Sequence, residues 1–108
     1  MRMLSLLFFK KDNIILELEK LEMQKREKEK LVDILDELVE YRLVNMVMSK
    51  LEKRDKELFI EQLYNGSAEI FIEFLREKIN DFEQVLAQYS KELEAEILED
   101  IESLQKNK

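Results

Sequence analysis

The sequence predicts an all-α protein: a compact bundle of about four helices, two of them short, with a long C-terminal helix and an N-terminal extension that is apolar and charged. Its 108 residues include no Pro and only one Gly, so it lacks the residues that β-rich folds use at their turns. Leu, Glu and Lys, which favour helices, are abundant. Apolar residues also recur at helical spacing. At this length we expect one domain.

The N-terminal extension covers residues 1–26, and its conformation is open between a helix, a β-hairpin and a segment that stays disordered until it is bound. The spacing of Ile14 and Leu18 predicts a helix that continues through the charged run 24–30. The alternation of apolar and polar residues around these positions also suits a β-hairpin with residues 3–9. The helix is favoured, because Leu, Glu and Lys have high helix propensity.

The bundle domain covers residues 27–108 and is divided by three breaks. Asn65 should end a helix and Ser67 should cap the next one. Asn80 is expected to cap the last helix, and Asp55 gives a weaker cap signal. The apolar and aromatic residues expected in the core are Leu31, Ile34, Leu35, Leu38, Val39, Tyr41, Leu43, Met46, Val47 and Leu51, then Leu58, Phe59, Leu63 and Tyr64, then Ile70, Phe71, Phe74, Leu75 and Ile79, and finally Phe82, Val85, Leu86, Tyr89, Leu93, Ile97, Ile101 and Leu104.

Residues 31–98 carry a recognisable succession of helices. A helix ending in Leu-Val-Asn-Met-Val (43–47) precedes a short helix that closes in Leu-Tyr-Asn-Gly (63–66), and Phe-Leu-Arg-Glu-Lys-Ile-Asn-Asp-Phe-Glu (74–83) follows. This resembles an uncharacterised family of small helical domains from candidate-phyla (Patescibacteria) bacteria, in which Pro usually stands where this chain has Asn80. The resemblance implies a helical domain, and it implies no known activity and no catalytic residues.

The composition excludes most kinds of active site. Without His or Cys there is no Ser-His-Asp or Cys-His arrangement, no Cys-based zinc site and no disulfide. One Gly is too few for a phosphate-binding loop. Carboxylate pairs such as Glu92/Glu96 and Glu99/Glu102 have the spacing for a hard cation, but no Gly-containing loop accompanies them, so we interpret them as solvated. We therefore expect no enzyme and no catalytic, cofactor-binding or metal-binding residue.

The first surface expected to bind a partner is the apolar patch 3–9, with Leu4, Leu7, Phe8 and Phe9 as its contact residues. So many apolar side chains cannot all face water in a well-behaved monomer. The patch either packs on the core of its own chain, binds a protein partner or second copy, or lies on a membrane surface. Of the last two, the protein partner is favoured, because a short apolar anchor binds weakly and the net charge of −7 opposes anionic lipid.

The second surface is the last helix, whose apolar residues form a narrow stripe flanked by acids. Leu93, Glu96, Ile97 and Asp100 are its expected contact residues, since such a seam is typical of a contact between two helices. Residues 81–108 contain three basic and eight acidic residues, a net charge of −5. The acidic charge is thus concentrated at this end of the chain.

Together these features predict a cytoplasmic, non-enzymatic protein–protein interaction or structural module that binds a protein or forms a homo-oligomer. Deletion of residues 1–12 is then expected to abolish association and leave the bundle folded. The alternative is an acidic helical inhibitor that mimics nucleic acid and blocks a basic site on a partner, through Glu94, Glu96, Glu99 and Asp100. Direct nucleic-acid binding is disfavoured, because Lys and Arg alternate with acids and form no basic cluster.

Overall fold

The computed structural model describes residues 3–106, and this part of the chain is helical without any strand, which confirms the all-α prediction. The helices are α1 (Met3–Phe8), α2 (Asp12–Glu19), α3 (Lys25–Ser49), α4 (Lys53–Asn65), α5 (Ala68–Lys78) and α6 (Phe82–Lys106). The hairpin alternative for the N-terminal segment is therefore wrong. The helical alternative holds with one change, since a break over residues 20–24 separates α2 from α3.

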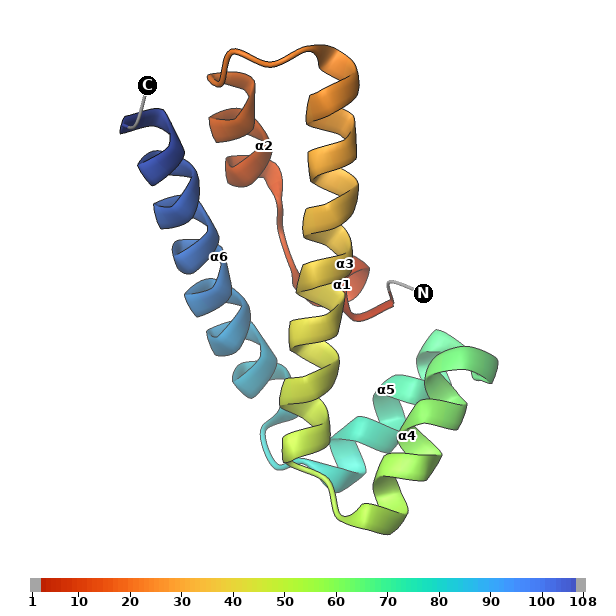
Figure 1. Cartoon of the computed structure of the whole chain (residues 1–108). Coiled ribbons are helices and arrows are strands. Elements are labelled where there is room, and N and C mark those ends of the chain that lie inside the picture. The colour runs from red at the N-terminus through yellow and green to blue at the C-terminus, as the bar shows by residue number, and fades with distance from the viewer. Residues whose placement is uncertain (1–2, 107–108) are drawn as a thin grey trace.

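The two long helices, α3 and α6, run antiparallel and set the length of the molecule (Figure 1). They diverge toward one end, where α2 lies between them, and α4 and α5 pack together at the other end. The molecule measures 48 × 24 × 21 Å, with a radius of gyration of 15.7 Å. A compact domain of about 100 residues has a radius of gyration of about 13 Å. The shape is therefore elongated, and the expected compact bundle is not observed.

One apolar core runs through the molecule and includes both N-terminal helices. Leu4 from α1 and Ile14 and Leu18 from α2 are as deeply buried as the core residues of the long helices. At the other end, the rings of Phe59 in α4 and Phe71 in α5 stack with centroids 5.5 Å apart. The N-terminal segment is thus part of the core, although we expected an extension beside a separate bundle domain.

The turn between α4 and α5 follows the prediction. The Ser67 hydroxyl accepts a hydrogen bond from the backbone N–H of Ile70 at 3.2 Å, as an N-cap should. Gly66 comes close to the end of α4, where an added Cβ would lie 2.8 Å from the backbone oxygen of Gln62. The single glycine of the chain therefore stands where a side chain would clash with the preceding helix turn.

The other two predicted caps are displaced. Asn80 was expected to cap the last helix, but α6 begins at Phe82 and follows Asp81, whose backbone is left-handed at φ 53°. Asp is among the few residues that tolerate this conformation. Asp55 lies inside the first turn of α4 and does not cap it, since that helix begins at Lys53.

Candidate functional site

The N-terminal patch packs on the core of its own chain, which was one of its three alternatives. Leu4 is completely buried, so its expected role as a surface contact is wrong for the folded monomer. Phe8 and Phe9 are half-buried against the core, and the Phe8 ring meets Phe82 edge to face at 5.4 Å. Of the apolar residues of α1, only Leu6 (79% exposed) and Leu7 (48%) lie largely in solvent.

A buried carboxylate on α3 explains why α1 docks there. The Glu40 side chain is almost fully buried, and its Oε1 accepts a hydrogen bond from the backbone N–H of Ser5 at 2.8 Å. The first N–H groups of a helix have no partner within the helix, and a negative charge at that end is favourable. Glu40 therefore caps α1 although it is 35 residues away from Ser5 in the sequence. Inspection of the residues next to α1 cannot identify such a cap.

Burial raises the pKa of Glu40 above its ordinary value of 4.5, while the backbone amides of Ser5 and Leu4 oppose this shift. Burial disfavours the charged form. The other carboxylate oxygen, Oε2, is buried without a hydrogen-bond partner among the described residues. The hydrogen bond to Oε1 thus offsets only part of the cost of burying the ionised Glu40 side chain.

We expect Glu40→Gln to gain stability relative to the native chain as the pH rises. Because the pKa of Glu40 is higher in the folded state, that state holds more protons than the unfolded chain from about pH 4.5 upward, and ionisation of Glu40 costs stability there. The free energy of unfolding of Glu40→Gln minus that of the native chain should rise above pH 4.5 by at most about 1.4 kcal/mol per pH unit, which is the effect of one proton. The difference should level off once Glu40 is ionised in the folded state. Urea unfolding between pH 4 and pH 8 measures it.

Glu83→Gln is the control for this series. Arg76 lowers the pKa of Glu83, so Glu83 contributes stability above its unfolded pKa and loses that contribution as the pH falls through its lowered, folded-state pKa. The free energy of unfolding of Glu83→Gln should therefore change with pH in the same way as that of the native chain, except below about pH 4.5. If the difference in free energy of unfolding between Glu40→Gln and the native chain is constant from pH 4 to pH 8, the role assigned to Glu40 is contradicted.

The predicted seam on the last helix is filled by the same chain. Leu93 and Ile97 are buried, so they are core residues and their expected role as partner contacts is wrong. The physical reason is α2, which packs along α6 and brings Ile14 and Leu18 into the same core. Glu96 and Asp100, the two acidic members of the predicted surface, remain at the surface.

One of these acids joins the two long helices at the surface. The Arg42 guanidinium of α3 contacts the Glu96 carboxylate at 3.0 Å and donates from Nε to the Tyr89 hydroxyl at 3.1 Å. The Arg42 hydrogen bond lowers the pKa of Glu96. Arg42 interrupts the apolar series of α3 because it lies at the border between α3 and α6.

An apolar surface on α3 was not predicted from the sequence. Ile34, Leu38 and Tyr41 were expected in the core, yet they are 60%, 42% and 65% exposed. Their spacing of four and three residues puts them on one side of the helix, away from the buried Val39 and Leu43. We call these three residues the α3 stripe. The available signal was that apolar residues occur on more than one side of α3.

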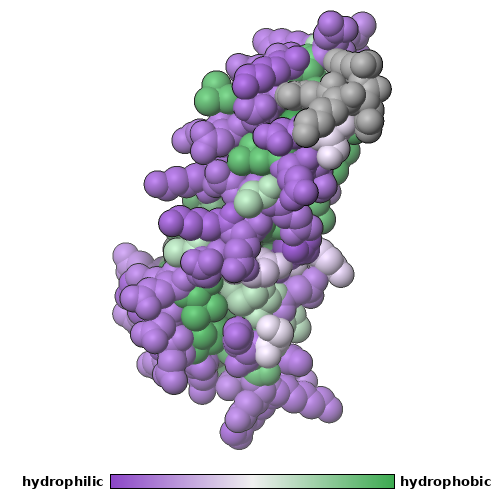
Figure 2. Space-filling view, turned by 90° about the vertical axis from the view of Figure 1, so that its left-hand side faces the viewer, coloured by the Kyte–Doolittle hydropathy of each residue, from purple (hydrophilic) through white to green (hydrophobic). Residues whose placement is uncertain are grey.

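The side of the molecule that includes α6 is mostly hydrophilic, with separate hydrophobic areas among the hydrophilic residues (Figure 2). Four exposed acids of α6, Glu92, Glu96, Glu99 and Asp100, are called the α6 acidic edge. No hydrogen bond or ion pair joins Glu99 or Asp100 to another described residue, whereas Glu92 accepts from Gln88 at 3.2 Å. The α6 acidic edge therefore presents carboxylates to solvent.

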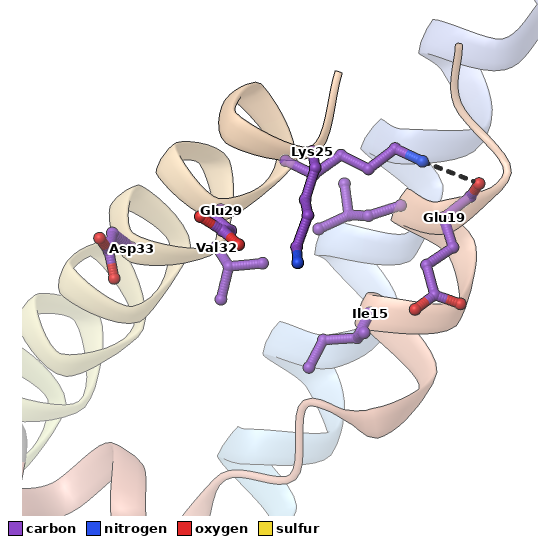
Figure 3. Close-up of a pocket in the computed structure, with 8 residues that line it drawn as sticks. Ile15, Glu19, Lys25, Glu29, Val32 and Asp33 are labelled. Atoms are coloured by element: carbon purple, nitrogen blue, oxygen red, sulfur yellow. Dashed lines mark hydrogen bonds between the residues drawn. The ribbon is translucent and has the colours of Figure 1, made fainter. Parts of the chain in front are cut away.

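The molecule also has an open hollow of about 400 Å³ between α2 and the beginning of α3. Ile15 and Val32 lie on its two sides, and charged residues such as Lys25, Glu29 and Asp33 surround them (Figure 3). Here the Lys28 ammonium donates to the backbone oxygen of Glu19 at 3.1 Å and ties the two helices together. These side chains include no nucleophile paired with a base, so the hollow offers no catalytic arrangement.

Neither a metal centre nor a membrane span is found in residues 3–106. No group of three or more acidic side chains there is placed to hold a metal ion. None of the helices in that range combines the length and the apolar character needed to cross a bilayer. In comparisons with known proteins, no family model, no curated protein and no solved structure matches this chain.

Proposed function

We propose that this protein is a non-enzymatic interaction module of the cytoplasm that binds another protein through the α3 stripe. The observation that carries the proposal is the exposure of Ile34, Leu38 and Tyr41 on the central helix. Contiguous exposed apolar side chains on a small soluble domain are typical of interaction sites. The position on a long helix supports it further, because a rigid element presents the side chains in a fixed geometry.

The surface proposed here differs from those that the sequence indicated. The residues 3–9 keep only Leu6 and Leu7 largely in solvent, and the apolar side of α6 is buried. The α3 stripe, by contrast, has three exposed apolar residues on one side of a single helix. Catalysis is left out of the proposal because the sequence has neither His nor Cys, and because its buried acid, Glu40, is engaged by the end of α1.

We do not extend the proposal to a nucleic-acid mimic. Such an inhibitor would need a row of free carboxylates on the last helix. Two of the four expected acids already have partners, since Arg42 binds Glu96 and the Asn13 amide donates to Glu94 at 3.2 Å.

Site-specific photocrosslinking in the native host tests the proposal. A photoreactive amino acid at Leu38 is expected to give a crosslinked product of defined mass, and the product should disappear when Ile34→Gln is added. The same amino acid at Glu61, an exposed position on α4, should give none. Equal crosslinking from the two positions, or a product that survives Ile34→Gln, would argue against the α3 stripe as a binding surface.

A further inference from the structure

We infer that Asn65 and Gly66 form a site of spontaneous deamidation at the junction between α4 and α5, and that the last turn of α4 controls its rate. Asn65 is the final residue of α4 and is exposed at the surface. Gly66, which follows it, is the only glycine in the chain. The inference does not depend on the α3 stripe, so it can fail without affecting the proposed function.

The reaction joins the side chain of Asn65 to the backbone of the next residue. The Gly66 backbone nitrogen attacks the Asn65 carbon Cγ, the bond from Cγ to the amide nitrogen breaks, and ammonia leaves with the proton that the backbone nitrogen gives up. The product is a succinimide ring. Water then adds to one of its two carbonyl carbons and opens the ring. Aspartate results when the new bond to Cγ breaks, and isoaspartate results when the main-chain bond breaks.

The residue after each asparagine decides how readily the ring closes. A side chain on that residue crowds the attacking nitrogen, and glycine has none. The other asparagines, Asn13, Asn45, Asn80 and Asn107, are followed by Ile, Met, Asp and Lys. Asn65 is therefore the one asparagine whose ring closure meets no such hindrance.

The fold does not accept a larger residue in place of Gly66. An added Cβ would lie 2.8 Å from the backbone oxygen of Gln62 and would also meet the Gln62 side chain. Backbone atoms that close cannot be relieved by a change of rotamer. The close approach that ends α4 thus requires glycine, and the labile pair persists as long as residue 65 is Asn.

The last turn of α4 restrains the attacking nitrogen. The Gly66 N–H donates to the backbone oxygen of Gln62 at 2.9 Å, and this hydrogen bond must open before the nitrogen reaches the Asn65 side chain. Helix ends open more easily than helix interiors. Opening here also brings water to the Gln62 Oε1, which is buried without a hydrogen-bond partner among the described residues. The turn therefore slows deamidation but does not prevent it.

Deamidation changes the charge and the length of the chain at this junction. Both products carry a carboxylate at the C-terminus of α4, where a negative charge is unfavourable. Isoaspartate also inserts a methylene into the main chain shortly before Ser67, whose hydroxyl caps α5. The reaction therefore loosens the contact between α4 and α5, and this change is irreversible.

Uptake of a heavy oxygen isotope from water tests the site. The full chain and its Asn65→Gln variant are kept at mildly alkaline pH in water enriched in that isotope, then digested in ordinary water and analysed by mass spectrometry. We expect label at residue 65 of the native chain, as aspartate and isoaspartate. The variant should stay unlabelled there, because its longer side chain closes a ring poorly. Asn13, Asn45 and Asn80 are internal controls and should stay unlabelled over the same time.

A peptide of residues 60–70 tests the restraint by the helix turn. The peptide should take up label about two- to tenfold faster than the folded chain, which is the factor that one hydrogen bond supplies. The full chain in guanidinium chloride should react at the rate of the peptide. The isoaspartate form of the chain, separated by chromatography, should exchange the amide hydrogen of Ile70 faster than the native form, because the Ser67 cap is displaced.

Three results would overturn the inference. Equal labelling of several asparagines would remove the special role of Gly66. A folded chain that stays unlabelled after the peptide has reacted completely would mean that Asn65 is not a modification site in the native protein. Equal rates in the folded chain and in the peptide would show that the last turn of α4 does not control the reaction.

Discussion

Replacing Phe59 by Ala is expected to lower the free energy of unfolding by about 3–5 kcal/mol, the range for a buried Phe in a packed core. Phe59 is completely buried in α4, and its ring stacks on Phe71 of α5 with an interplanar angle of 27°. Removing the ring loses its apolar contacts and leaves a cavity between the two short helices. Urea unfolding followed by circular dichroism measures the loss.

Tyr64→Ala is the matched control for this variant. Tyr64 is an aromatic residue of the same helix, but it is largely exposed, so its removal should change the free energy of unfolding by no more than about 0.5 kcal/mol. Similar losses in the two variants would mean that the stacked pair does not hold α4 against α5.

Leu4→Ala is expected to lower the free energy of unfolding by about 2–5 kcal/mol, because Leu4 is completely buried and removing most of its side chain leaves a cavity in the core. Because Leu4 belongs to the core, deletion of residues 1–12 is no longer expected to leave the bundle folded. That deletion removes Leu4 and also the helix end that Glu40 caps, so it should destabilise the remaining chain instead of leaving the bundle folded. Urea unfolding of the full-length variants measures the effect.

The control for Leu4→Ala is Leu6→Ala in the same short helix. The Leu6 side chain is largely exposed, and its replacement should change the free energy of unfolding by no more than about 0.5 kcal/mol. If Leu4→Ala unfolds at the same urea concentration as Leu6→Ala, α1 does not contribute to the core in solution, and residues 1–12 are separable as the sequence suggested.

The helical class could be predicted because local chemistry decides it. High helix propensity, the lack of Pro and the Ser67 cap all favour helices without reference to the rest of the chain. The two N-terminal helices were harder, since six and eight residues are too few for a helix to be stable alone in water. Their stability comes from distant contacts, such as the hydrogen bond between Ser5 and Glu40.

The candidate surface could be predicted only in part, because a periodic pattern does not say which neighbour covers each side of a helix. On α6 the acids Glu96 and Asp100 are at the surface as expected, but Leu93 and Ile97 are covered by α2. On α3 apolar residues occur on several sides, and the arrangement of the other helices leaves the α3 stripe uncovered. The choice between buried and exposed sides is thus made by tertiary packing.

The elongated shape of the molecule affects how its mass is measured. With one axis of 48 Å and two of 24 and 21 Å, the monomer meets more hydrodynamic friction than a sphere of equal volume. It should elute from a sizing column ahead of compact standards of 13.1 kDa, so the column calibration would assign it too large a mass. Sedimentation velocity separates friction from mass, and it should give a raised frictional ratio together with the mass of a single chain.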